Sequence, residues 1–570
     1  MASAMRKAIA MGYDRTTLRA DVMAGLAVSI VALPLSMALA IAVGAPPAHG
    51  LYSTVVAGFV VALLGGSKFQ VTGPTAAFVV ILSPITQKYG LGGLLTTGLM
   101  AGLILVVMGG ARLGRLIAFI PYPVTTGFTA GVATIIATLQ IRDAFGLQVA
   151  HMPDSWFAKL HVFWEARRTI AYAELGVAVA TLALLLLVPL WTKRIPAPLV
   201  AILAVTVGTV VLHWLFPRFG VATIGNRFQS VVDGRAYAGI PPLPPRPMLP
   251  WGSHGLSFSM VRELASPAFA IAMLAAIESL LSAVIADGMT QKKHDPDAEL
   301  VALGIGNMVA PFFGGIAATG VLARTATNVR SGARTPVAAM THSVAVLLAI
   351  LLLAPGLVFV PMAALAALLL LVAWNMSDVG HALRMLRFAP KSDISVLVGC
   401  YLLTVVFDMV IAVSVGVVTA ALLFMRRMAE LTKVRIIDEE YAESDHVLPE
   451  GVVVYEIAGP LFFGAAQNAM GQLDVVDRAV RVVVLSLGRV PTIDATGIVA
   501  LESAIERLRR GKKLVVIAGP LPEPRRIFDK ANLRAEHEHL YFTDSLSDAI
   551  GLAGGLAEVS PISTRRPSQA

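Results

Sequence analysis

Residues 69–78 read FQVTGPTAAF and lie among long apolar runs. The tripeptide Thr-Gly-Pro at 72–74 is poor helix material, because glycine and proline both disfavour a helix interior. In hydrocarbon, each backbone group left without a hydrogen bond is costly. A break in this setting therefore predicts backbone that lines a cavity inside the protein and does not face lipid.

The composition is that of a membrane protein. Hydrophobic residues make up 56% of the chain and charged residues 14%, against roughly 45–50% and about 25% in ordinary soluble domains. The net charge of +9 comes from Lys and Arg that fall between apolar runs, which fits membrane topology and not a nucleic-acid partner. The single cysteine, Cys400, excludes a disulfide within the chain.

The amino-acid composition changes near residue 426, from mostly apolar before it to more polar after it. We expect a cytoplasmic amino-terminal segment (1–20), a transmembrane domain (21–426), a linker (427–450), a soluble domain (451–555) and a disordered end (556–570). The basic amino terminus lacks a small-residue cleavage pattern, so we interpret it as retained sequence and not as a signal peptide.

A helix needs about 20 apolar residues to cross a bilayer, and the chain offers about fourteen candidates. They lie near 22–43, 49–65, 69–86, 91–110, 121–140, 171–191, 197–215, 266–287, 298–313, 316–330, 336–354, 357–374, 392–408 and 410–425. With the amino terminus inside, most Lys and Arg of the short loops become cytoplasmic. This distribution predicts that both termini and the soluble domain are cytoplasmic.

The break at 72–74 has a counterpart. Residues 317–325 read AATGVLART, another Thr-Gly, in the second of two halves of about seven spans each. Paired interruptions at matching positions are typical of transporters built from inverted repeats, in which broken helices meet near the bilayer midplane. For a single occurrence, a packing kink in an ordinary transmembrane helix is the simpler interpretation.

This arrangement predicts an anion site. We expect extended chain through Gln70–Gly73 with a helix from Pro74, and a second helix from Val321 after Thr319-Gly320. The free N–H groups of two helix starts carry partial positive charge and would face one cavity. The hydroxyls of Thr72, Thr75 and Thr319 are candidate further donors.

Ionisable residues inside spans are functional candidates because their insertion is costly. We expect Glu278 to carry a coupling proton, or else to form a fixed ion pair. Arg324 either holds an anionic substrate through two parallel hydrogen bonds or neutralises Glu278. Structural roles are favoured for two further carboxylates and two arginines near span ends: Asp287, Asp408, Arg330 and Arg334. Asn328 and Thr325 would face the cavity only if their helix runs straight.

With these residues in place, the chain resembles the sulfate permease (SulP) family of anion transporters. The resemblance rests on VTGPTAAFVVILSPI (71–85), IPYPVTTGFTAGVA (120–133), IESLLSAVIADGMT (277–290) and FGGIAATGVLARTATNVRSGART (313–335). It implies a multi-span α-helical membrane protein of 14 spans as 7+7 inverted repeats, with core and gate domains and a cytoplasmic STAS domain. A homodimer is the family-level expectation.

Carried over to this chain, the family's site falls on Gln70–Ala76, Glu278 and Thr319–Thr325. Its substrate-binding residues are then Gln70, Thr72, Gly73, Thr75, Ala76, Thr319, Gly320, Val321, Arg324 and Thr325. Family members commonly carry Ser beside the arginine, where this chain has Ala323 and Thr325, and this departure weakens the case for sulfate.

From about residue 451 the pattern changes to alternating strands and helices. GVVVYEIAGPLFF, RVVVLSLG and KLVVIAG are expected strands, and GIVALESAIERLRRGKKL is an expected helix. This part resembles the STAS domain, which suggests a cytoplasmic protein partner. In the loop PTIDATG, Thr496 is either a phosphorylation switch or, together with Asp494, a helix cap, and the cap is favoured. No metal-ligand cluster, P-loop or nucleophile elbow is present.

The leading hypothesis is a cofactor-free secondary transporter of the bacterial inner membrane. The resemblance is strongest to aerobic four-carbon dicarboxylate transporters, which implies proton-coupled uptake of succinate, fumarate, malate or aspartate. The alternatives are a sulfate/proton or sodium/bicarbonate symporter on the same scaffold, or a membrane-anchored regulator that signals through the STAS domain. An enzyme is not expected.

Overall fold

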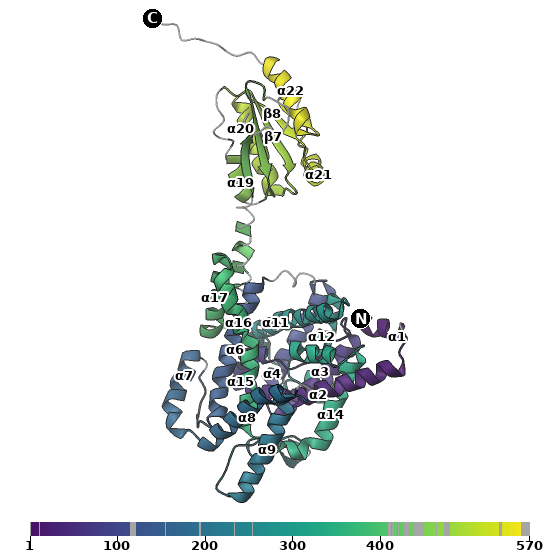
Figure 1. The fold of residues 1–570 in the computed structure, drawn as a ribbon, viewed down its shortest axis with the longest axis vertical. Coiled ribbons are helices and arrows are strands. Elements are labelled where there is room, and N and C mark those ends of the chain that lie inside the picture. Colours follow the sequence, from purple (N-terminus) through teal and green to yellow (C-terminus); the bar gives the residue numbers. More distant parts are fainter. Residues whose placement is uncertain are drawn as a thin grey trace. The chain divides into compact units, whose positions relative to one another are not determined.

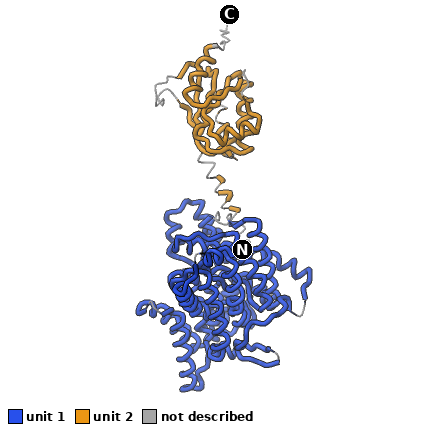
Figure 2. Tube along the Cα trace, turned by 90° about the vertical axis from the view of Figure 1, so that its right-hand side faces the viewer, with its two compact units in different colours: residues 1–417 blue, residues 418–570 orange. Residues whose placement is uncertain are grey.

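The chain forms two compact units, residues 1–417 and 418–570 (Figure 2). The computed structural model describes residues 2–559 apart from 11, 115–120, 154, 193–194, 233, 253–254, 408–411, 413–414, 417, 420, 424, 427–431, 438–447, 463, 472, 474–478 and 535–538. Asp408 lies outside the described residues, as do 410, 411, 413, 414, 417, 420 and 424 of the predicted last span at 410–425.

The first unit is almost entirely helical (Figure 1). Its long helices are α2 (Arg15–Ala42), α3 (Pro47–Leu64), α4 (Val79–Gly110), α6 (Tyr122–Ala144), α8 (Tyr172–Trp191), α9 (Ala197–Leu215), α11 (Phe258–Thr290), α14 (Val337–Leu357), α15 (Met362–Ser377) and α17 (Lys391–Val406). Shorter pieces are α1 (Ser3–Ala10), α7 (Trp156–Glu165), α12 (Pro296–Val309), α13 (Leu322–Arg330) and α16 (Val379–Phe388). Among the described residues, nine helical segments are long and apolar enough to cross a membrane.

Helices from both halves of the sequence interleave in one group. In this core group, α12 packs on α4 and α3, α14 packs on α2 and α3, and α11 packs on α4 and α13. A gate group consists of α6, α8, α9, α15 and α17, where α15 packs on α6 and α8, and α17 packs on α6. Each group therefore combines matching elements of the two halves, as inverted repeats require.

The two predicted short spans differ from ordinary crossings. The label α4 covers two helices that meet at Gly90, where φ is 61° and ψ is −159°, so the predicted spans at 69–86 and 91–110 are separate helices here. The second short span, predicted at 316–330, is the strand β4 (Thr319–Gly320) followed by α13. The predicted span at 69–86 is interrupted at Thr72–Gly73 and the one at 316–330 at Thr319–Gly320, so each interruption lies at a Thr-Gly pair.

The amino-terminal end of α2 is capped by Asp14, which accepts a hydrogen bond from the backbone of Thr17 (2.8 Å). Hydrogen bonds from Thr17 and Thr16 lower the pKa of the Asp14 carboxyl to about 2. One turn into α2, the buried Asp21 accepts from the backbone N–H groups of Arg334 (2.7 Å) and Thr335 (3.1 Å). This carboxylate ties the first span to the turn that follows α13.

The second unit is a five-stranded sheet in the order β5-β6-β7-β8-β9. Its elements are β5 (Lys433–Ile437), β6 (Val452–Ala458), α19 (Gly464–Gly471), β7 (Val482–Arg489), α20 (Ala495–Arg510), β8 (Leu514–Ala518), α21 (Pro522–Lys530), β9 (Leu540–Thr543) and α22 (Leu546–Val559). All neighbouring strands are parallel except β5 and β6. One hydrophobic cluster buries residues of α19, α20 and α21, and a separate one buries residues of α22.

The strands and the helix predicted from 451 onward correspond to β6, β7, β8 and α20. Two predictions at the borders are wrong. Residues 433–437, expected in a linker, form β5, because they pair antiparallel with β6. Residues 556–559, expected to be disordered, continue α22, whose Ala549, Ala553 and Ala557 are buried against the sheet.

Replacing the cap of α20 tests the interpretation of the loop at 491–497. Asp494 accepts from the backbone N–H of Gly497 (2.7 Å), whereas the Thr496 side chain is exposed. Asp494→Ala is expected to lower the unfolding free energy of a fragment of residues 430–560 by about 1 kcal/mol. Thr496→Ala should change it by less than about 0.5 kcal/mol. Urea titration of both variants measures this, and equal losses would contradict the cap.

Candidate functional site

A two-residue ladder joins the two interruptions. The strand β1 (Thr72–Gly73) pairs antiparallel with β4, with Thr72 opposite Gly320 and Gly73 opposite Thr319. A further backbone hydrogen bond runs from the N–H of Val321 to the carbonyl of Val71 (2.9 Å). The ladder pairs backbone groups that a broken helix would otherwise leave without partners.

Both half-helices begin beside this ladder. After β1, the short 3-10 helix η1 (Ala76–Phe78) leads into α4, and after β4 the helix α13 begins at Leu322. Antiparallel strands run in opposite directions, so the two helices leave the ladder in opposite directions and both present their amino ends to it. The predicted meeting of two helix starts is thus what the geometry shows.

The first helix start was predicted two residues too early. We expected helix from Pro74, but Thr75 is extended (φ −118°, ψ 152°) and its hydroxyl accepts from the N–H of Ala77 (3.4 Å). Thr75 thus acts as the cap, and Pro74 stays outside the helix. Likewise Val321 is the residue before α13 and not its first helical residue.

One face of α11 lies against the ladder. Thr319 donates its hydroxyl hydrogen to the carbonyl of Ala275 (2.9 Å), and Gln70 donates its side-chain amide to the hydroxyl of Ser279. Ser282 donates to the hydroxyl of Thr325 (3.0 Å). These α11 positions are three to four residues apart, so they share one helical face.

Glu278 belongs to this face and interacts with the Thr75 hydroxyl. Both side chains are partly exposed, although their neighbours Ala76 and Ser279 are buried. At the other helix start, Val321 is half-buried and Leu322 is 42% exposed. The accessible part of the site therefore consists of the cap at Thr75, the carboxyl of Glu278 and the first turn of α13.

Arg324 lies in a buried environment, with 1% of its surface exposed. Its Nη2 donates to the hydroxyl of Ser36 on α2 (3.0 Å). Its Nε and Nη1 have no hydrogen-bond partner among the described residues. The described residues also show no ion pair between Arg324 and Glu278, so the fixed pair that the sequence left open is not formed here.

The remaining predicted site residues hold the ladder together. Thr325 accepts from the N–H of Val71 (3.1 Å), and the hydroxyl of Thr319 is bonded to α11 as described. Both were predicted to bind a substrate, but their hydroxyl groups are used within the protein. The Thr72 hydroxyl and the Gln70 side-chain oxygen are buried without partners in the described structure. Gly73 and Gly320 are packed so closely that a Cβ would collide with the side chains of Arg324 and Gln70.

A second set of polar residues surrounds the ladder, and of these only Asn328 was singled out from the sequence. Asn307 on α12 donates to the carbonyl of Ala318 (2.8 Å) and accepts from its N–H (2.8 Å). Asn328 on α13 donates to the carbonyl of Phe69 (2.8 Å). The Ser53 hydroxyl of α3 donates to the carbonyl of Ile316. These bonds fix the chain just before each Thr-Gly pair.

Asp287, near the end of α11, makes hydrogen bonds that fit the structural role predicted for it. Asp287 accepts from the His294 ring (2.7 Å) and from its backbone N–H (3.0 Å). Arg330 is exposed at the end of α13. A carboxylate that sequence reasoning missed, Glu299, is buried and accepts from the N–H groups of Gly66 (2.8 Å) and Ser67 (2.9 Å). It supports the turn that leads into β1.

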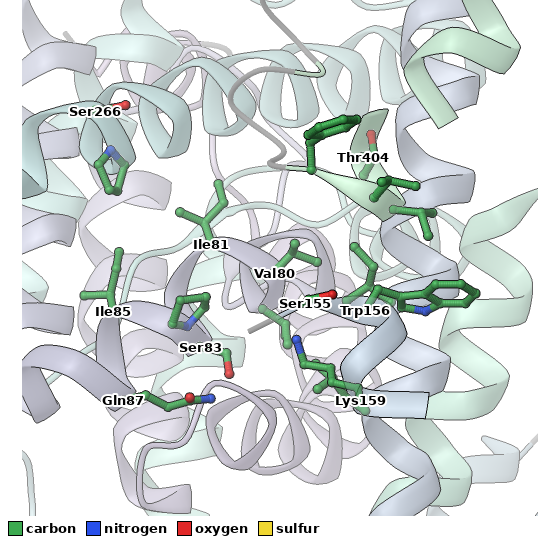
Figure 3. A pocket seen from close by; sticks show the side chains of 18 residues that line it. Val80, Ile81, Ser83, Ile85, Gln87, Ser155, Trp156, Lys159, Ser266 and Thr404 are labelled. Atoms are coloured by element: carbon green, nitrogen blue, oxygen red, sulfur yellow. The ribbon is translucent and has the colours of Figure 1, made fainter. Parts of the chain in front are cut away.

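A pocket of about 280 Å³ begins next to the first half-helix (Figure 3). It follows α4 from Val79 to Gln87 and is closed by residues of α6, α7, α11 and the end of α17. Val79 is the first residue of α4 and follows η1 directly. The pocket thus lies between the core group and the gate group, beside the site but not within it.

The class of protein is a multi-span membrane transporter for anions. It follows from the interleaved halves of the sequence, the ladder between β1 and β4, and the partial positive charges of the two helix amino ends. Residues 18–400 match the description "Sulfate permease family", and residues 445–549 match "STAS domain". The chain belongs to the sulfate permease family and carries a STAS domain after its membrane unit.

Three similar proteins illustrate this membership. A Bacillus subtilis protein named "Putative sulfate transporter YvdB" is 37% identical over 95% of this chain and 98% of its own length. "Bicarbonate transporter BicA" of Picosynechococcus is 30% identical over 90% of this chain and 91% of its own length. The structure of the murine Slc26a9 anion transporter in the inward-facing state has a TM-score of 0.83 at 17% identity and covers 97% of this chain and 94% of its own, a likeness in fold.

A methyl group at Gly73 tests the close approach of Arg324 to the ladder. Gly73→Ala is expected to displace the buried guanidinium and to reduce anion uptake into proteoliposomes about tenfold, since overpacking typically costs about 1–3 kcal/mol. The matched control is Gly288→Ala on α11, because nothing lies within 4 Å of a Cβ there. Equal uptake by both variants would show that the approach is not needed.

Proposed function

We propose that the protein takes up a small inorganic oxyanion, sulfate in the first place, together with protons, by alternating access. Sulfate is chosen over bicarbonate because the relative at 37% identity is named a putative sulfate transporter and the one at 30% a bicarbonate transporter. Four-carbon dicarboxylates, which the sequence favoured, have no such support from these named relatives.

The observation that carries the proposal is the pairing of β1 with β4. It brings two helix starts to one ladder: the turn capped by Thr75 follows β1, and the first turn of α13, with its exposed Leu322, follows β4. Free N–H groups at helix starts carry a fraction of a positive charge and bind oxyanions without a counter-ion. We therefore assign the direct substrate contacts to Thr75 and to the first turn of α13 that follows Val321, whereas Ala76 is buried and the Val321 N–H is already bonded to Val71.

Arg324 acts through its charge in this proposal. The guanidinium lies beside Gly73 and is bonded to Ser36, and the described residues show no ion pair between it and Glu278. A cation in a poorly polarisable interior still raises the potential at a neighbouring site. Arg324 would thus favour an anion at the ladder without touching it, in place of the two parallel hydrogen bonds expected from the sequence.

Glu278 is assigned the coupling proton. It interacts with Thr75, which caps the first half-helix, so its charge state is coupled to a direct substrate contact. A potential that is negative inside opposes the entry of each negative charge by about 2.3 kcal/mol per 100 mV. Protonation of Glu278 removes a negative charge from the site and lets an oxyanion enter together with the proton.

The remaining assignments follow the same proposal. The membrane is the bacterial inner membrane, both termini are cytoplasmic, and two copies form a homodimer. The STAS domain would contact a cytoplasmic protein partner through the region of Thr496, which is exposed at the start of α20. A purely regulatory role without transport is the competing function, and both Thr-Gly pairs and the buried Arg324 argue against it.

Uptake of radiolabelled sulfate into proteoliposomes tests the cargo. Each proton carried down a gradient of about one pH unit contributes about 1.4 kcal/mol, so accumulation should rise about tenfold per coupled proton. An excess of unlabelled sulfate should compete, whereas succinate should not. Stronger competition by succinate than by sulfate would restore the dicarboxylate hypothesis. Uptake of bicarbonate that a sodium gradient stimulates would favour a sodium/bicarbonate symporter. If neither sulfate, succinate nor bicarbonate is taken up, a regulator would be favoured.

Glu278→Gln tests the coupling role. The amide keeps the shape of the side chain but cannot release a proton, so accumulation driven by a pH gradient should disappear while sulfate exchange at equal pH persists. The control is Glu263→Gln on the same helix, an exposed residue paired with Lys88 (2.6 Å). Proton-driven accumulation by Glu278→Gln would refute the assignment.

A further inference from the structure

The short helix α16 presents an apolar stripe to the outside of the protein. It joins α15 to α17, both of the gate group (Figure 1). It does not continue α15, because Asp378 between them has a left-handed φ of 40°. Val379, Leu383 and Leu386 are exposed, Leu383 by 51%. Residues four and three apart lie on one face of a helix, so these three side chains form a continuous stripe.

Two arginines lie beside this stripe. Arg384 and Arg387 are three residues apart, so they are neighbours on the helix surface, and both are exposed. With 3.6 residues per turn, Arg387 lies about 40° and Arg384 about 100° around the axis from Leu383. Neither arginine forms an ion pair with a described residue, the adjacent Asp378 included. The polar face of α16 therefore carries positive charge that the described structure does not neutralise.

A third face of α16 is held by the protein. Met385 is buried, and the ring of His381 meets the ring of Tyr122 on α6 edge-on, with 5.1 Å between the ring centres. His381 and Met385 are four residues apart and share a face. Because this face is fixed on the gate group, the apolar stripe and the two arginines are directed outward in one orientation.

This order of faces fits the boundary of a bilayer. α16 lies between two apolar helices of the membrane unit, so it is placed near the depth where hydrocarbon meets the lipid headgroups. A helix with a basic polar face beside an apolar face lies in this interface, with its apolar residues toward the acyl chains. Within α16 there are two arginines and no carboxylate. The matching partner therefore has a negative charge joined to an apolar chain.

We propose that α16 binds an anionic phospholipid. The phosphate pairs with Arg384 and Arg387, and an acyl chain lies along Val379, Leu383 and Leu386. Guanidinium groups suit phosphate oxygens because they can donate two parallel hydrogen bonds. A free phosphate would leave the apolar stripe unused, whereas a phospholipid uses both faces at once.

The bound lipid also holds the gate group at the membrane surface. In transporters of inverted repeats, alternating access is largely a movement of one bundle against another. A gate group fixed to lipid through α16 gives the core group a body to move against, so uptake should require anionic lipid. This second part rests on the proposed function, whereas the lipid binding does not.

Native mass spectrometry of the delipidated full chain, titrated with phosphatidylglycerol, tests the site. The first phosphatidylglycerol should bind about 25-fold more tightly than phosphatidylcholine with the same acyl chains, since each of two arginines contributes about fivefold. Glycerol 3-phosphate, which lacks acyl chains, should not compete. Equal binding of phosphatidylcholine would show that charge is not recognised, and competition by glycerol 3-phosphate would identify a site for free phosphate. Either result would overturn the proposal.

Substitution of the arginines locates the site. Arg384→Gln combined with Arg387→Gln should abolish the preference for phosphatidylglycerol, and lysine at both positions should restore most of it. Exposed arginines are replaced here, so folding should be unaffected. The matched control is Arg330→Gln, because Arg330 is exposed at the end of α13, outside α16. An unchanged preference in the double glutamine variant, or an equal loss in Arg330→Gln, would overturn the assignment.

Sulfate uptake into phosphatidylcholine vesicles with and without phosphatidylglycerol separates the two parts. Phosphatidylglycerol should speed uptake by the unmodified chain, and this stimulation should be lost in the double glutamine variant, on which the surface charge of the vesicle acts equally. Binding that depends on the arginines without any stimulation of uptake would overturn the role in holding the gate group. Such binding in a protein that transports no anion would support the lipid site while refuting the proposed function.

Discussion

The antiparallel pairing of Thr72–Gly73 with Thr319–Gly320 is the constraint from which the rest of the membrane unit follows. Two helices can be interrupted inside a bilayer only if the freed backbone groups find partners. Here each interruption supplies partners for the other. Because the strands are antiparallel, the two halves must enter the membrane in opposite senses, which is why an inverted repeat and a central ladder occur together.

The ladder also determines which side chains surround it. Glycine is required at Gly73 and Gly320 because the side chains of Arg324 and Gln70 occupy the space of a Cβ. Asn307 and Asn328 bind the chain that enters the ladder, and α11 closes one side. With the polar groups of the ladder largely occupied by these bonds, the accessible Thr75, Glu278 and first turn of α13 are left for a substrate.

Much of this was predictable from the sequence, since the Thr-Gly pairs and Glu278 stand out among apolar neighbours. The direction in which the polar side chains point was not predictable from the sequence. Thr319 and Thr325 look like substrate ligands until α11 and Val71 are seen to take their hydrogen bonds. The bond between Arg324 and Ser36 joins residues far apart in sequence, and the Asn307 bonds to Ala318 depend on the turn at Gly314, where φ is 73°.

The separation of Arg324 from Glu278 has a mechanistic consequence. A direct ion pair would cancel both charges and leave the ladder with only its partial charges. With Arg324 bonded to Ser36 on α2 and Glu278 on the accessible side, the cation is permanent and the carboxyl is free to change its charge. Under the proposed function, the potential at the site then depends on one proton, and a proton and an anion would be drawn to the ladder together. In the proposed function, coupling thus follows because these two opposite charges beside one short strand pair are not bonded to each other.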